Sequence, residues 1–185
     1  SLFTVTAMLS RPFSGKLADK IGRVPVIMVG SIVCFLCSLV YPLLTTVAGF
    51  LLLRLLHGFS TGFTPTGTAA YLSDIIPAER RGEAMGLLGT AGSLGMAGGP
   101  AVGGTLANHF GLNAVFYCSS AFALISVLIL VGIKETLEEK HTFGFGLLKV
   151  NRSDLFEPRV LAPCLVMLFL GYSYGASFTL LPVFG

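Results

Sequence analysis

Long apolar runs dominate this chain, and short polar connections separate them. Five runs are each at or above the ~20 residues that a helix needs to cross a bilayer. They cover residues 24–44, 46–73, 83–107, 113–133 and 160–184. Residues 1–10 form a run about half that length before Arg11, so we expect the chain to begin inside a span. No run alternates in polarity as barrel strands do, so the pattern predicts an all-α membrane protein, a bundle of transmembrane helices.

The edges of these runs carry residues typical of helix ends. We expect Pro25 in a first turn, Thr46 and Asn113 as N-caps, Pro77 closing a helix and Pro158 before the last one. Residues 134–159 are polar, carry both signs of charge and read as a linker between two helical units, 1–133 and 160–185. Within it, 143–150 is either an amphipathic surface helix or a disordered stretch.

Lysine and arginine collect in every second connection between the runs, where all but two of the 12 are found. They are Lys16, Lys20 and Arg23; Arg80 and Arg81; and Lys134, Lys140, Lys149, Arg152 and Arg159. By the positive-inside rule, 16–23, 79–83 and 134–159 are cytoplasmic and 108–112 faces outward. This orientation fits a multi-pass protein of a bacterial inner membrane or plasma membrane.

The amino-acid composition is typical of a membrane protein. Charged residues make up 11% of the chain and the mean hydropathy is +0.83, so the lipid bilayer is its solvent. The net charge of +3 lies almost wholly in the cytoplasmic connections and is no argument for nucleic acid. Cys34 and Cys37 have CxxC spacing on one helix without a second ligand pair, so we interpret them as small buried hydrophobes. We expect no metal and no cofactor.

A polar stripe follows the run from Thr46 to Ser73 at steps of three and four residues. It consists of Arg54, His57, Thr61, Thr64 and Thr68, with Leu52, Leu56, Phe59 and Phe63 on the other, lipid-like face. Arg54 lies about 12 Å from the outer end of its helix, where an unpaired guanidinium is costly. Either a buried ion pair or a water-filled pathway meets it, and His57 is either a satisfied buried histidine or a titrating one.

The run 83–107 carries glycines on one helical face, at 86, 89, 92, 95, 99 and 103. Small residues at this spacing allow close backbone approach, and Pro100 removes a hydrogen bond to Met96 and bends the helix. Two interpretations fit this glycine face: tight static packing against a neighbouring helix, or a helix that slides against a partner.

The connection from Gly15 to Arg23 is short enough to be a tight turn, and Asp74 ends a run on the same membrane face. Arg23 and Asp74 are therefore expected to pair at the interface, unless these charges are solvated and serve only topology.

These residues carry a family resemblance to the major facilitator superfamily. The connection from Gly15 to Arg23 resembles the signature of this superfamily between helices two and three. The run 46–73 resembles its fourth-helix signature at Arg54, Gly58 and Gly62, with His57 in place of the usual Gln. The fifth-helix signature, associated with antiporters, matches throughout. The loop positions are Gly15, Leu17, Ala18, Asp19, Gly22 and Arg23, and the fifth-helix positions are Gly86, Gly95, Gly99, Pro100, Gly103 and Gly104.

The resemblance implies that the chain covers helices two (partial) to seven of a twelve-helix transporter with two halves that rock around a midplane site. It implies a conformational latch at Gly15, Asp19, Gly22, Arg23 and Asp74, and a role for Arg54 in proton coupling. The expected partners are protons and a small organic molecule such as a drug or metabolite, with a functional monomer at full length.

Export by proton antiport is the leading functional hypothesis, and proton-coupled import of a sugar or organic acid is the alternative. An intramembrane enzyme would need nucleophiles, metal ligands or paired carboxylates at membrane depth, whereas all nine acidic residues lie at the cytoplasmic side or in the linker. A channel would need a ring or filter, which the sequence does not supply.

Overall fold

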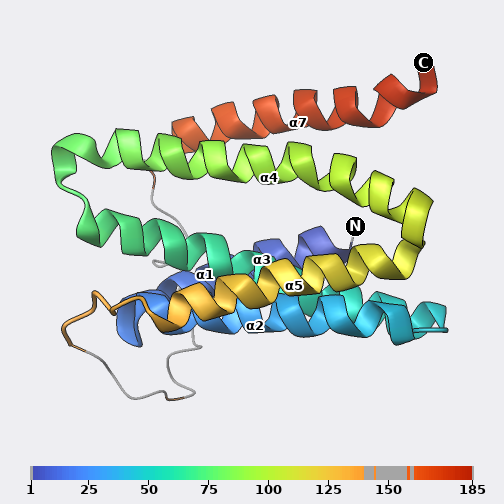
Figure 1. Ribbon diagram of the computed structural model, residues 1–185. Coiled ribbons are helices and arrows are strands. Elements are labelled where there is room, and N and C mark those ends of the chain that lie inside the picture. Colours follow the sequence, from blue (N-terminus) through green and yellow to red (C-terminus); the bar gives the residue numbers. More distant parts are fainter. Residues whose placement is uncertain (1, 140–143, 145–157, 159–160, 185) are drawn as a thin grey trace. The chain divides into compact units, whose positions relative to one another are not determined.

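The computed structural model describes residues 2–139, 144, 158 and 161–184, with side chains up to residue 176, and it is all-helical over these residues (Figure 1). Its elements are α1 Leu2–Lys20, α2 Arg23–Val40, η1 Tyr41–Leu43, α3 Val47–Ile75, η2 Ala78–Arg80, α4 Arg81–Phe110, α5 Leu112–Val131 and α7 Leu161–Phe184. The predicted all-α fold is confirmed. Most of the predicted linker 134–159, including the stretch 143–150 apart from Gly144, lies outside the described residues.

The chain divides into two compact units, Ser1–Lys149 and Val150–Gly185. The first contains α1 to α5, and the second contains α7, an apolar helix whose described side chains are almost all exposed. A division of the chain around the linker remains a prediction.

Three segments of the described chain are long and apolar enough to cross a membrane: Arg23–Leu43, Val47–Ile75 and Leu112–Val131. Residues 161–176 form a shorter apolar stretch. Helix α4 is long enough, at 30 residues, but it is less apolar because glycine contributes little to hydropathy.

The first helix extends further than the sequence predicted. An apolar run that stops at Arg11 suggested that the span ends there, but α1 continues through Arg11 and Pro12 to Lys20. The predicted tight turn is therefore reduced to Ile21 and Gly22. Gly22 has a φ of 137°, and the chain reverses there between α1 and α2. A charged residue ends a hydrophobic run without ending the helix, and α1 contacts α3 from Phe3 to Gly15.

The helix ends follow the predicted chemistry except at α5. Thr46 caps α3, its Oγ1 accepting from the Gly49 N–H at 3.3 Å, and Pro77 follows the C-cap Ile76. The expectation that Asn113 caps α5 is wrong, because the helix begins one residue earlier, at Leu112. Gly111 occupies the cap position with a φ of 83°, a backbone conformation that asparagine adopts less readily than glycine.

Helices α1 and α3 approach each other at backbone distance. A Cβ placed on Gly62 of α3 would collide with Ser10 Oγ of α1 and lie 2.9 Å from the Ala7 carbonyl oxygen. One turn away, a Cβ on Gly58 would meet the backbone of Phe3, and Ser14 Oγ donates to the Gly62 carbonyl at 2.8 Å. Small residues spaced by four on both helices thus make this interface.

The interior of the first unit combines apolar side chains, such as Leu17, Val26 and Phe63, with small polar ones. All the buried polar residues among the described ones are serines, namely Ser10, Ser14, Ser31, Ser38, Ser60 and Ser120. Large apolar side chains also cover the outside, including Leu52 at 64% exposure and Leu56 at 59%. Apolar side chains on the outer surface are what a lipid-facing bundle requires, because the bilayer gives no hydrophobic drive for helix association.

Phe63 is an exception to the predicted faces of α3. The sequence placed it on the lipid-like side, but it is only 4% exposed and packs in a cluster with Leu17, Ala18 and Val26. The helix is in contact with α1 and α2 on two sides, so its buried arc is wider than one polar stripe.

Replacing Gly62 by alanine should destabilise the bundle by about 1–3 kcal/mol, the usual cost of overpacking a closely packed interface. Gly15→Ala is the matched control, because a Cβ at Gly15 would lie at an ordinary 3.8 Å from Thr66 Cγ2. Thermal unfolding of the full-length protein in detergent measures both. Equal unfolding midpoints for the two variants would contradict the close approach at Gly62.

Candidate functional site

Two groups of polar side chains occupy the first unit, one within the spans and one at the end where α1 meets α2. Of the predicted stripe on α3, the hydroxyls are satisfied by their own helix: Thr61 Oγ1 donates to the His57 carbonyl at 3.4 Å and Thr68 Oγ1 to that of Thr64 at 2.8 Å. Thr64 itself packs against α2, since a Cβ on Gly30 would collide with its hydroxyl. Thr64 therefore lies at a helix contact, while Thr61 and Thr68 bond to the backbone of their own helix.

Arg54 is half-buried and meets aromatic faces. Its Cζ lies 5.5 Å from the centroid of the Tyr41 ring and 5.2 Å from that of Phe50. No carboxylate of the described part of the chain forms an ion pair with it. Cation–π contacts of this kind are worth about 0.5–2 kcal/mol, so they only partly offset the cost of a guanidinium at this depth. A cavity of about 520 Å³ adjoins it, lined also by Leu2, Phe3, Phe50 and Leu51.

His57 lies one turn further along α3 and shares the Tyr41 ring with Arg54. Its Nδ1 is 3.3 Å from the Tyr41 hydroxyl and its Nε2 is 3.7 Å from Cys34 Sγ, while Phe3 packs edge-on at 5.6 Å. Tyr41 also stacks on Phe116 of α5 at 5.0 Å. Tyr41 was not predicted from the sequence, although a tyrosine near the end of a span is typical of the membrane interface.

Arg23 is the centre of the second group, at the start of α2. Its Nε donates to Asp74 Oδ2 at 2.8 Å, its Nη1 donates to the Ala18 carbonyl at 2.6 Å, and its Nη2 lies 3.5 Å from Asp19 Oδ1. The predicted pairing of Arg23 with Asp74 is present in the structure. Asp19 is more loosely held, with 68% of its side chain exposed. Arg23 thereby joins the ends of α1, α2 and α3.

Glu135, which the sequence analysis did not single out, completes this group. Its Oε1 accepts from the Arg23 N–H at 3.0 Å and its Oε2 from the Val24 N–H at 3.0 Å, so it caps α2 from a position more than 100 residues away. A carboxylate here is favoured by the partial positive charge of a helix N-terminus. A Cβ on Gly22 would collide with this carboxylate, which gives Gly22 a second reason to be glycine.

The neighbouring residues secure the same segment. Thr136 Oγ1 donates to Asp74 Oδ2 at 2.7 Å, so Asp74 accepts from both Arg23 and Thr136. Burial acts to raise the pKa of the Glu135 carboxyl, but the backbone N–H donors of Leu137, Arg23, Val24 and Thr136 outweigh it and hold the pKa below its ordinary value. Glu135 is therefore a carboxylate at neutral pH.

Other latch and glycine residues lie apart from these groups. Gly15 is within α1, in ordinary contact with Thr66 of α3. On α4, Gly95, Gly99 and Gly103 border a groove of about 480 Å³ against α5, and only Gly103 has a close neighbour, Val115 Cγ1 at 3.5 Å. Gly86 and Gly104 have open space around them within the described residues, and Pro100 lies inside an unbroken helix.

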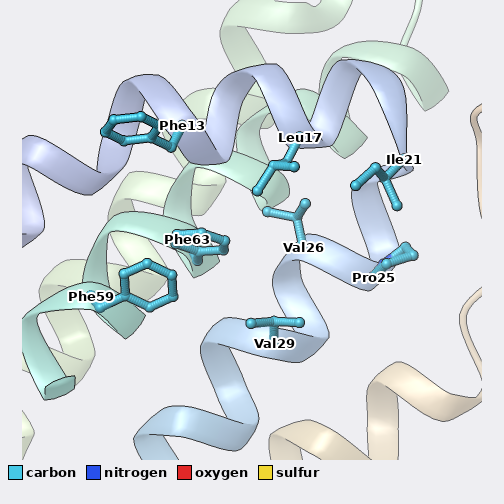
Figure 2. Close-up of a pocket in the computed structure, with 8 residues that line it drawn as sticks. All are labelled: Phe13, Leu17, Ile21, Pro25, Val26, Val29, Phe59 and Phe63. Atoms are coloured by element: carbon cyan, nitrogen blue, oxygen red, sulfur yellow. The ribbon is translucent and has the colours of Figure 1, made fainter. Parts of the chain in front are cut away.

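A third cavity, of about 610 Å³, lies between α1, α2 and α3 (Figure 2). Its lining is wholly apolar: Phe13, Leu17, Ile21, Pro25, Val26, Val29, Phe59 and Phe63. It holds no polar group that could orient a ligand or carry a proton. Within the described residues no cluster of three or more His, Cys, Asp or Glu side chains could hold a metal ion.

Comparison with known proteins places these features in one family. All of residues 1–185 match the model of the Major Facilitator Superfamily. The chain is 37% identical over 142 residues to Multidrug resistance protein 2 of Bacillus subtilis, covering 75% of this chain and 35% of that protein. It is 33% identical over 139 residues to the multi-drug resistance efflux pump PmrA of Streptococcus pneumoniae, with the same coverage.

A third relative is Multidrug resistance protein MdtG of Salmonella typhi, 33% identical over 131 residues, or 69% of this chain and 32% of that protein. The chain therefore spans about a third of the length of these relatives. Among solved structures, that of the peptide transporter POT bound to alafosfalin is similar in fold, with a TM-score of 0.67 and 15% identity over 97% of this chain and 36% of that one.

The lowered pKa of Glu135 makes a pH prediction. A carboxyl whose folded-state pKa is depressed contributes stability that is fully present above its unfolded value, near 4.5, and is lost as the pH falls through the lower folded value. The difference in unfolding midpoint between the wild-type protein and Glu135→Gln should thus be constant above about pH 5 and shrink in more acidic buffer.

Glu139→Gln is the control for this titration, because it removes the same charge from an exposed position four residues further on. Its midpoint in neutral buffer should lie close to that of the wild type, because the side chain is exposed. A difference between the wild type and Glu135→Gln that stays the same down to pH values near 3 would show that the charge of Glu135 does not stabilise the folded state.

Proposed function

Because this chain belongs to the major facilitator superfamily, we propose that the full-length protein is a secondary active transporter that exports small organic molecules in exchange for protons. The similarity to three drug-resistance proteins at 33–37% identity carries this proposal. The names of these relatives concern drug resistance and efflux. Alternating access of two halves in a cell membrane is the mechanism that such a protein would use.

Arg54 is the proposed coupling residue of the described chain. A guanidinium within the span, held by aromatic faces and lying beside a cavity, is available to a carboxylate or an anionic group that arrives there. Protonation of that carboxylate would release the guanidinium, and loss of the proton would bind it again. Tyr41 transmits the change to His57, because both side chains contact its ring.

Arg23, Asp19 and Asp74 are the proposed conformational latch. Three helix ends meet at one guanidinium, so any rocking that separates α2 from α3 must break the 2.8 Å contact between Arg23 and Asp74. We place this end of the unit in the cytoplasm, as the basic residues indicate. The glycine face of α4 is then free to approach a helix of the other half during the transport cycle.

Proton coupling predicts that export stops without a pH gradient. In vesicles of the full-length protein, an acid-inside gradient should drive uptake of a fluorescent organic cation such as ethidium, and a protonophore should abolish it. Protein-free vesicles control for passive movement of the dye. Uptake that continues unchanged after the gradient is collapsed would reject proton coupling.

Arg54→Ala should lower driven transport more than about tenfold, or 1.4 kcal/mol, while the protein still inserts. Arg54→Lys should fail in large part as well, because an ammonium group does not reproduce the planar guanidinium that lies over Tyr41 and Phe50. Arg80→Lys, at an exposed position, is the control. Full transport activity in both Arg54 variants would make the residue structural only.

A further inference from the structure

The segment that leaves α5 is fixed to the latch by its own hydrogen bonds. Glu135 holds the first two N–H groups of α2 and Thr136 holds Asp74, which is also the acceptor of Arg23. The Glu135 Oε1 also accepts from the N–H groups of Thr136 and Leu137 at 2.9 and 3.0 Å. The carboxylate therefore also holds the backbone of its own segment. One carboxylate thus organises two backbone segments at once.

Arg23 connects these two anchors. Its backbone N–H binds Glu135 while its side chain binds Asp74, and Asp74 in turn binds Thr136. The contacts close a ring that runs from the start of α2 through the end of α3 to the segment after α5. A ring of this kind opens as a unit, because the loss of one contact removes the geometry of the next.

We propose that Glu135 is a positioning residue of the latch: it ties the segment after α5, where the chain leaves the helical unit, to Arg23 and Asp74, so that this segment detaches when the latch opens. The inference deepens the proposed function, since it rests on the existence of two states that differ at this end of the unit. It goes beyond a stabilising cap, because a cap alone would hold equally in both states.

Spin labels on the full-length protein test the attachment directly. Lys20→Cys and Glu138→Cys place labels at exposed positions on α1 and on the segment after α5. With Glu135 intact, we expect one short distance in the latched state and a second, longer one in the open state. Glu135→Gln should change the ratio of the two populations at least fivefold in favour of the longer distance, within the usual range of coupling between states. Glu139→Gln should leave the ratio unchanged.

Non-additivity separates this role from general stabilisation. If Glu135 and Asp74 act through one ring, Glu135→Gln combined with Asp74→Asn should shift the ratio no further than the larger single change. Glu135→Asp, which keeps the charge on a shorter side chain, should shift it less than Glu135→Gln. Effects that multiply, or a distance distribution in Glu135→Gln identical to that of Glu139→Gln, would overturn the inference.

The labels report independently of transport. A protein whose dye uptake ignores the pH gradient but whose distances respond to Glu135→Gln would refute the proposed coupling and keep this inference. The opposite result would keep proton-coupled export and reduce Glu135 to a helix cap.

Discussion

The close approach of α3 to α1 is the constraint on which the rest of this unit depends. Lipid offers no hydrophobic drive for helices to associate, so contact at backbone distance and hydrogen bonds such as that from Ser14 to Gly62 must supply the cohesion. Gly58 and Gly62 make that contact possible. Once α3 is held in this way, Arg54 and His57 are brought to Tyr41 at one end and Asp74 to Arg23 at the other.

The guanidinium groups of Arg54 and Arg23 are stabilised in different ways. Within the span, Arg54 is accommodated by the aromatic faces of Tyr41 and Phe50 and borders a cavity. At the helix ends, Arg23 is already satisfied by Asp74, Asp19 and the Ala18 carbonyl. In the function we propose, the first arrangement would respond to a proton or substrate and the second would hold one conformational state.

Sequence reasoning reached the all-helical fold and the meeting of Arg23 with Asp74, because apolar run length and loop charge are local signals. The glycines fall into two sets. The glycine face of α4 borders a groove against α5 among the described residues, and its packing or sliding stays a prediction, whereas Gly58, Gly62 and Gly67 of α3 make close contacts with neighbouring helices. The role of Glu135 could not be predicted, because it lies in a charged stretch with Lys134, Glu138 and Glu139. No local sequence signal indicates that it caps a helix more than 100 residues away.

Hydrogen exchange at the start of α2 tests most directly whether the charged ring opens with the transport cycle. In the full-length protein, we expect the amides of Arg23 and Val24 to be protected while Glu135 accepts from them. We expect conditions that break the latch and drive the protein to its open state to speed exchange in a peptide covering 21–26, while the first turn of α3, capped by Thr46, exchanges as before. Equal protection of 21–26 in both states would contradict it.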